Sequence, residues 1–328
     1  MIAALVLLAT TSGAIAVANL DGRIARDGDV ELLLERARLL GDHDALARAA
    51  AAAEEGPVTA ESLLRRAHAR AAVHRFADAL GDAEAAERAG ARADRTGAVR
   101  TSVLVATGRA DEVVPELECL AALRPGFATA SGLAGAYAAA GRFAEADALY
   151  DGALAHLDTT SPFPYAWTEF ARGVMWAEHA GDTARGEAAY RRALGYLPAL
   201  AGANVHLAEI EAARGDLAPA MARLARVADA TGEPEALALL GRLHVQTGDG
   251  DRGRAEIERA RRRFESLLVR HPLAFADHAA EFYLGPGADP ARADALARMN
   301  AANRGTARAQ ALARRAARAL AGARASED

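Results

Sequence analysis

A turn residue followed by a polar or charged residue recurs through most of this 328-residue chain at nearly constant spacing. The pairs are Gly41-Asp42, His74-Arg75, Gly108-Arg109, Gly141-Arg142, Gly181-Asp182, Gly215-Asp216 and Gly248-Asp249. The successive intervals are 33, 34, 33, 40, 34 and 33 residues, which is the signature of an internal repeat. Glycine suits these positions because a helix that ends in a left-handed residue meets no steric clash there. The repeat therefore predicts two helices per unit, separated by one tight turn.

Apolar residues recur at helical spacing on both sides of each turn. The clearest unit carries Leu133, Ala134, Tyr137, Gly141, Phe143, Ala146, Tyr150 and Ala153. This pattern resembles the tetratricopeptide repeat (TPR), whose first helix carries Leu-Gly/Ala and Tyr and whose second helix carries Ala, an aromatic residue and Ala. Neighbouring units repeat parts of the pattern and end in the family's closing proline, at Pro125 and Pro198.

The resemblance implies an all-α fold, a right-handed α-solenoid of about seven to eight stacked TPR-like helix hairpins with a C-terminal capping helix. Hairpins of this kind must stack, because one alone cannot bury its apolar stripe. The predicted organisation is a signal peptide over 1–18, a short linker over 19–26, a TPR array over 27–266, a degenerate TPR-like hairpin over 267–303, and a capping helix and tail over 304–328. The predicted array units are 27–59, 60–93, 94–126, 127–159, 167–200, 201–233 and 234–266.

The first residues are typical of a secretory signal. An apolar run over 2–9 is followed by small residues and an Ala16-x-Ala18 cleavage pattern. No Lys or Arg precedes the run, so the positive segment of a signal peptide is missing or the true start lies upstream. The competing interpretation is a first helix that packs on the array. The pattern favours a periplasmic or secreted bacterial protein, with a cytoplasmic one as the alternative, and the run is too short to span a bilayer.

Composition narrows the partners and the chemistry. Acidic side chains outnumber basic ones, 44 to 39, and every basic residue is arginine. The net charge of −5 argues against a dedicated nucleic-acid binder. A single cysteine excludes a disulfide framework and any multi-cysteine metal site. The last predicted helix is basic, which suits a charged outer face that keeps the array soluble or, alternatively, a contact with anionic lipid or nucleic acid.

The 40-residue interval contains an insertion around 156–167, and aromatic residues gather beside it. They include Phe163, Tyr165, Trp167 and Trp176, although aromatics make up only 5% of the chain. Large side chains are expected to plug repeats that a longer connection forces apart. The alternative is an aromatic anchor for a peptide or partner protein.

The resemblance also implies a concave groove lined by the first helix of each unit. Its phase places the following residues on that face: Arg65, His68, Arg95, Ser102, Arg172, Met175, Glu178, His179, His206, Glu209, Arg242 and Gln246. The predicted partner-binding residues among them are Arg172, Met175, His179, His206, Glu209 and Arg242. A mixture of Arg, His and Glu suits an extended peptide of mixed or acidic character. The family's chaperone-tail clamp uses Lys and Asn, so a chain without lysine is not expected to carry it.

Catalytic signatures with the required spacing are absent from the sequence. His206 with Glu209, and His278 with Glu281, stand three residues apart and share a helix face, but two ligands do not close a metal site. These pairs are interpreted as surface ion pairs, and Cys119 as a buried small hydrophobe. No catalytic residue, metal or cofactor is therefore expected.

The predicted function is a non-catalytic TPR scaffold or adaptor that binds a peptide or partner protein in the concave groove, in the bacterial cell envelope. The alternative is an enzyme or peptide-responsive regulator with a site near Arg172, His206 and Glu209. The oligomeric state is left open.

Overall fold

The computed structural model describes residues 2–325, with side chains from residue 12 onward. The predicted tail residues 326–328 and the side chains of the apolar run 2–9 lie outside the described part. The described residues form helices and no strand, which confirms the all-α solenoid. After α1 (Ile2–Asp27), eight hairpins follow: α2 (Val30–Leu40) with α3 (His43–Ala53), α4 (Ala60–Ala72) with α5 (Phe76–Arg88), α6 (Ala93–Ala106) with α7 (Val114–Leu123), α8 (Phe127–Ala139) with α9 (Phe143–Ala155), α10 (Phe163–Val174) with α11 (Thr183–Tyr196), α12 (Ala201–Ala213) with α13 (Leu217–Thr231), α14 (Pro234–Gln246) with α15 (Gly250–Arg270), and α16 (Pro272–Leu284) with α17 (Pro290–Asn303). The helix α18 (Ala307–Ala325) closes the array.

The turns adopt the left-handed conformation that the repeat predicts. Gly141, between α8 and α9, has φ 78°, and Gly181, Gly215 and Gly248 have φ 71°, 88° and 93°. His74 takes the same conformation without being glycine, at φ 58°. Each hairpin therefore turns at the position that the sequence spacing marks.

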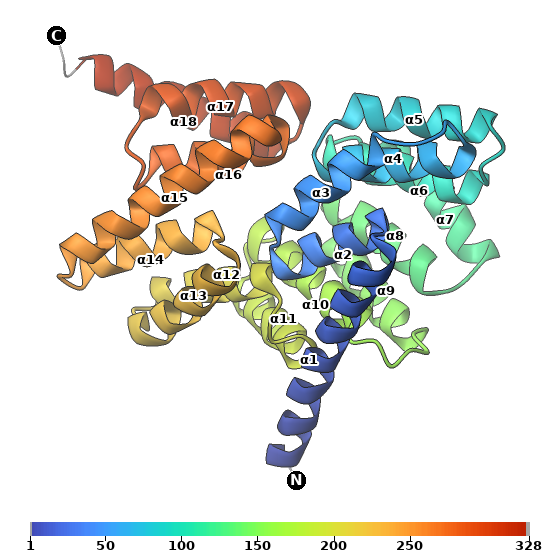
Figure 1. The fold of residues 1–328 in the computed structure, drawn as a ribbon, viewed down its shortest axis with the longest axis horizontal. Coiled ribbons are helices and arrows are strands. Elements are labelled where there is room, and N and C mark those ends of the chain that lie inside the picture. The colour runs from blue at the N-terminus through green and yellow to red at the C-terminus, as the bar shows by residue number, and fades with distance from the viewer. Residues whose placement is uncertain (1, 326–328) are drawn as a thin grey trace.

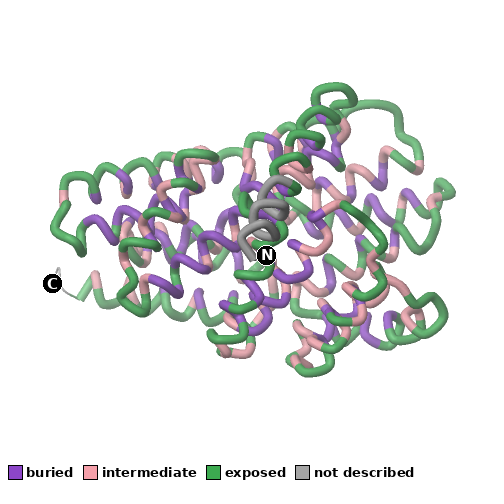
Figure 2. The backbone as a smooth tube through the Cα atoms, turned by 90° about the horizontal axis from the view of Figure 1, so that it is seen from below, coloured by how far each residue is buried: buried purple, intermediate pink, exposed green. Residues whose placement is uncertain are grey.

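Small residues let the two helices of a hairpin approach each other. In α8 and α9, Ala134 and Ala146 are fully buried, and Tyr137 and Tyr150 are 8% and 4% exposed. Figure 2 shows buried positions along the middle of the helix stack and exposed positions along its outer edges. The alternation of small and large side chains gives each interface its close packing.

The two ends of the solenoid pack against each other. Leu46 of α3 and Val73, which follows α4, belong to the same buried cluster as residues of α12 to α18. Residues of α1, α2 and α3 share a second buried cluster with α10, α11 and α12. The His43 ring of α3 meets the Phe275 ring of α16 edge-on at 5.0 Å. Figure 1 shows α2 beside α12, and the two helices are in contact, so the first hairpin packs against a hairpin far along the chain.

The long interval is accommodated differently from the sequence-based prediction. Its extra residues form a connection over 156–162 and a π-helical turn, η2 (Met175–His179), that extends α10. Phe163, Tyr165 and Trp167 lie in α10 itself, not in an inserted loop. The aromatic residues are therefore part of a helix that packs between its neighbours.

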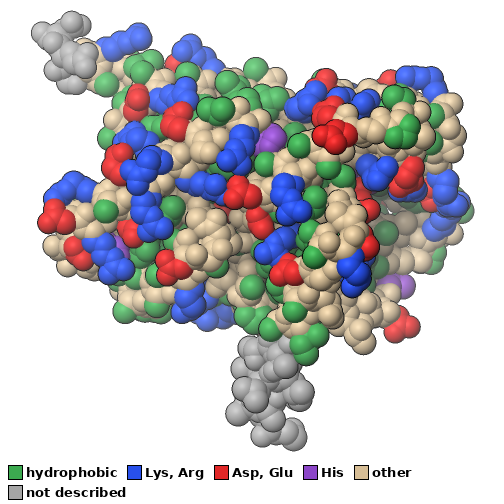
Figure 3. Space-filling model, viewed as in Figure 1, with side chains coloured by type: hydrophobic (Ala, Val, Ile, Leu, Met, Phe, Trp, Pro, Cys, Tyr) green, Lys and Arg blue, Asp and Glu red, His purple; other side chains and the backbone are tan. Residues whose placement is uncertain are grey.

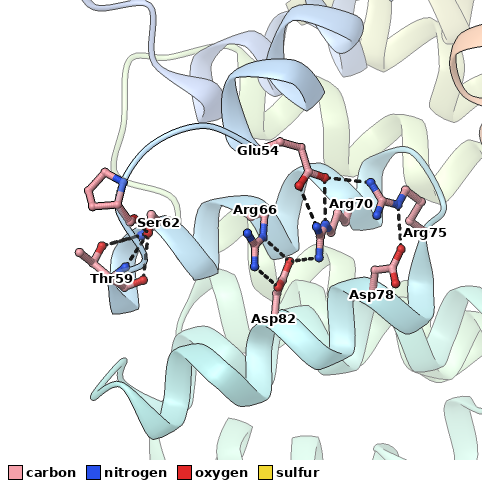
Figure 4. Close-up of polar contacts among 9 residues, drawn as sticks. Glu54, Thr59, Ser62, Arg66, Arg70, Arg75, Asp78 and Asp82 are labelled. Carbon is pink, nitrogen blue, oxygen red and sulfur yellow. Dashed lines mark hydrogen bonds and ion pairs between the residues drawn. The ribbon is translucent and has the colours of Figure 1, made fainter.

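A buried ion-pair network joins α4 to α5 (Figure 4). The Asp82 side chain is 6% exposed and accepts hydrogen bonds from Arg66 Nε at 3.0 Å and Arg66 Nη2 at 2.7 Å. Arg70 Nη1 lies 2.8 Å from Asp82 Oδ2, the oxygen that also accepts from Arg66 Nε, so the two arginines share one carboxylate. Arg70 also donates to Glu54, at the end of α3, so the network connects the first hairpin to the second.

Candidate binding groove and a histidine–glutamate cluster

A cavity of about 700 Å³ lies between the first two hairpins and α16, beside the contact that joins them. We call it the inner groove, and its lining combines apolar and charged side chains: Glu31, Leu32, Leu34, Glu35, Ala37, Arg38, His43, Leu46, His68, Ala72, Ala274 and Phe275. These residues come from α2, α3, α4 and α16, which meet only because the solenoid closes on itself. None of the six predicted partner-binding residues lines this groove.

Ion pairs fix the rim of the inner groove. His68 Nδ1 lies 2.6 Å from Glu31 Oε1, which joins α4 to α2. His43 Nε2 lies 2.9 Å from Glu233 Oε2, just before α14. The Arg38 guanidinium stacks 4.3 Å from the centre of the Trp167 ring. Several charged side chains at the rim are therefore already paired within the chain. The apolar side chains of the lining are left to contact a partner.

Two of the predicted groove residues are buried, so the prediction is wrong for them. The Arg172 side chain is 8% exposed and is enclosed by carboxylates: its Nε lies 2.9 Å from Asp147 Oδ1, and its Nη2 pairs with Asp151. Met175, in η2, is 1% exposed. Arg172 and Met175 hold α10 against α9 and offer no surface to a partner.

The remaining predicted groove residues divide into two groups. His179 and Arg242 are exposed, on η2 and α14, and the structure does not bring them together with the others. Although His179 is exposed, neighbouring atoms partly desolvate its ring, and this desolvation, followed by the charge of Arg308, lowers the pKa of His179. His206 and Glu209 do lie together on α12, as their spacing predicts, with His206 Nδ1 3.1 Å from Glu209 Oε2.

The aromatic residues beside the insertion are engaged inside the chain. Phe163 and Trp176 are each 8% exposed, and Trp176 Nε1 donates a 3.0 Å hydrogen bond to Asp147. The Tyr165 ring stacks on Tyr196 at 5.1 Å. Together with the Arg38–Trp167 stack, these contacts favour the interpretation in which the aromatics plug the repeats.

Sequence spacing missed the true partners of His278. Its predicted neighbour Glu281 pairs with Arg315 of α18, whereas His278 Nδ1 lies 2.5 Å from Glu235 Oε1 of α14. The charges of Glu235 and then Asp277 raise the pKa of His278 to about 10. Its partner stands 43 residues away, so no helical periodicity signals the pair.

Cys119 is exposed, which corrects its predicted burial. It shares α7 with the buried Val114 and Leu117, but it lies on the opposite side of that short helix.

Basic and acidic side chains are interspersed over the face shown in Figure 3, without a large area of one sign. Within the described residues, we find no helix with the length and apolar character needed to cross a membrane.

Comparison with known proteins bears on the fold. No family model matches the sequence, and no curated protein matches it. A chain in the crystal structure of the APC/C hetero-tetramer Cut9–Hcn1 is 14% identical, with a TM-score of 0.50 over 88% of this chain. This chain covers 62% of that one, less than two thirds of its length.

Two further solved structures are similar at lower scores. A tetratricopeptide repeat protein from Parabacteroides merdae is 14% identical, with a TM-score of 0.43, over 80% of this chain and 99% of its own. The human IFIT1 dimer with m7Gppp-AAAA is also 14% identical, with a TM-score of 0.43, over 79% of this chain and 63% of its own. The helical hairpins and the similarity to the chain of the Cut9–Hcn1 structure agree on an all-α solenoid.

Proposed function

We propose that this chain is a non-catalytic scaffold or adaptor that binds a peptide or partner protein in the inner groove. The observation that carries the proposal is the cavity of about 700 Å³ between the two ends of the solenoid. Its volume is in the range of ligand sites that enclose most of a bound group. Leu34, Leu46 and Phe275 give it an apolar lining within a charged rim. Such a lining suits an apolar side chain of a partner segment, with polar contacts at the edge.

Ala72 allows a direct test, because it lines the inner groove and is itself exposed. A photo-crosslinking amino acid placed at Ala72 in the producing cells is expected to capture a partner that mass spectrometry identifies. Ala72→Trp would then fill the groove and weaken binding of that purified partner by at least about tenfold, or 1.4 kcal/mol.

Val58 provides the matched control, since it is 78% exposed and does not line the groove. Val58→Trp adds the same bulk elsewhere on the surface and is expected to leave the affinity unchanged. Equal affinity of the two tryptophan variants would overturn the proposal. Circular dichroism of both variants reports whether the helices are retained.

The proposal includes a location in the bacterial cell envelope, supported by the apolar N-terminal segment and the Ala16-x-Ala18 pattern. Cleavage after Ala18 would leave Asn19 as the first residue. Leu20 and Ile24, the buried residues of α1 that follow, would stay in the mature chain. N-terminal sequencing of the protein from its own cells tests this, and an N-terminus before residue 19 would exclude cleavage at this site.

A further inference from the structure

Three side chains that carry metal-ligating atoms converge where the solenoid is irregular. Glu178 comes from the π-helical turn η2, and His206 and Glu209 come from α12 of the next hairpin. One carboxylate oxygen of each glutamate and a ring nitrogen of His206 all lie within 4.8 Å of one another. The sequence identified only the pair on α12, because Glu178 joins it through the stacking of two hairpins.

The separations fit a single small cation. His206 Nδ1 lies 3.1 Å from Glu209 Oε2 and 3.7 Å from Glu178 Oε1. Zinc–ligand bonds of about 2.0–2.2 Å in a tetrahedron place neighbouring ligand atoms about 3.3–3.6 Å apart. Both carboxylates approach the same ring nitrogen, so one ion can reach all three ligands after small side-chain adjustments.

The His206 ring is held in place by an aromatic floor. It stacks on Tyr190 with the rings 8° from parallel and their centres 5.4 Å apart, and it contacts Phe170 at 5.9 Å. Tyr190 is fully buried and fits because Gly173 has no side chain, where a Cβ would overlap the tyrosine ring. Packing of this kind fixes the orientation of a ligand before an ion arrives.

A buried polar atom beside the cluster lacks a partner. Among the described residues, none forms a hydrogen bond with the Tyr190 hydroxyl. This hydroxyl belongs to the ring that stacks on the His206 ring, so it is part of the same packed layer as one of the three ligands. Buried hydroxyls are normally hydrogen-bonded, so an unpartnered one on the ring that packs against His206 points to a missing occupant.

We infer that Glu178, His206 and Glu209 bind one divalent transition-metal cation of the zinc class. Imidazole nitrogen with two carboxylate oxygens is a donor set that zinc accepts, and three protein ligands leave a fourth position for water or a partner's carboxylate. The side chains are 28%, 29% and 49% exposed for His206, Glu178 and Glu209, so an ion has access from solvent. The bound ion would join the fifth hairpin to the sixth. This site is independent of the inner groove.

His278 also has two carboxylate neighbours, but their arrangement is that of ion pairs and not of a metal site. Glu235 approaches Nδ1 at 2.5 Å and Asp277 approaches Nε2 at 3.7 Å. Carboxylates on opposite ring nitrogens cannot share one ion with that ring. His278 is therefore the matched control for loss of a histidine beside two acids.

The test is calorimetric titration of zinc chloride into the full chain after chelator treatment and dialysis. All variants carry Cys119→Ser, because the exposed thiol is itself a zinc ligand. We expect one ion per chain, with at least about 100-fold weaker binding in His206→Ala and in the conservative Glu209→Gln. The parent is the chain with Cys119→Ser alone, and His278→Ala is expected to bind zinc with the same affinity as this parent. Zinc should also raise the melting temperature of the parent and not of Glu209→Gln.

Absence of saturable zinc binding to the parent would overturn the inference. Equal affinity in Glu209→Gln would overturn it too, since this exposed substitution removes one ligand charge without disturbing the aromatic floor. If His206→Ala loses its helical circular dichroism signal, Glu209→Gln alone decides. A parallel titration with manganese chloride identifies the class of ion, and tighter binding of manganese than of zinc would contradict the zinc assignment.

Discussion

His74 donates a 3.1 Å hydrogen bond from Nδ1 to the main-chain oxygen of Leu273, 199 residues further along the chain. His74 stands at a turn where most hairpins have glycine, and its φ of 58° costs about 1–2 kcal/mol for a residue with a Cβ. Asn303 Nδ2, at the end of α17, donates a 3.0 Å hydrogen bond to the main-chain oxygen of His74. The unfavourable turn residue thus joins the second hairpin to the eighth.

Acid should weaken this junction. Burial, followed by the charge of Arg304, lowers the pKa of His74 to about 4 from the ordinary 6.5. The unfolded chain therefore takes up a proton at higher pH than the folded chain, and this contribution to stability is present above pH 6.5 and lost as the pH falls toward 4. The loss is at most about 3 kcal/mol. Urea unfolding at pH 7.5 and pH 5 measures it.

His74→Asn is the control for this prediction. Asparagine tolerates the left-handed region, and its amide can still donate a hydrogen bond, but it does not titrate. The variant should lose less stability than the parent between pH 7.5 and pH 5. If both lose the same amount, other groups cause the acid sensitivity and His74 does not.

Gly173→Ala should destabilise the protein, because the added methyl group would overlap the buried Tyr190 ring. Overpacking of this kind costs about 1–3 kcal/mol. Gly135→Ala in α8 is the matched control, since its methyl group meets no atom within 4 Å. It should stabilise the helix by up to about 1 kcal/mol. Chemical denaturation of both variants measures the difference, and effects of equal sign would contradict the packing argument.

The hairpins could be predicted from sequence because their determinants are local. A glycine such as Gly141 ends one helix, and small and large residues at helical spacing define the facing surfaces. Closure of the solenoid could not be predicted, because it rests on contacts such as His74 with Leu273 between distant parts of the chain. Periodicity carries no information about which distant hairpins meet.

The candidate site was predictable only in part, for the same reason. His206 and Glu209 share a helix face, so their spacing revealed them, whereas Glu178 reaches them from the preceding hairpin. Arg172 was expected to be exposed because its phase places it on the groove face, but Asp147 and Asp151 from α9 surround it. The position of a residue along its helix predicts the direction in which its side chain points. Packing against the neighbouring hairpin decides whether that side chain is buried.

Asp82→Ala should destabilise the protein by about 2–3 kcal/mol, because it leaves the guanidinium groups of Arg66 and Arg70 without their shared carboxylate. Asp94 provides the contrast, since it pairs with Arg92 on the surface, where Arg92 is 73% exposed. Asp94→Ala should leave the free energy of unfolding nearly unchanged. Urea denaturation of the two variants tests this, and a comparable loss in both would argue against a special role for the network of Figure 4.

Truncation of α1 at two positions should show how much its second half, residues 19–26, contributes to the free energy of unfolding. A chain that begins at Asn19 keeps Leu20 and Ile24, which are 2% and 7% exposed against the first hairpin and α11. A chain that begins at Asp27 lacks both side chains and should lose about 3–6 kcal/mol more, since burial of each contributes about 1.5–3 kcal/mol. Urea denaturation of the two truncated chains gives the difference. Equal stabilities would mean that α1 does not stabilise the closed solenoid, whereas the expected order would make residues 20–26 part of the folded unit even after cleavage at Ala18.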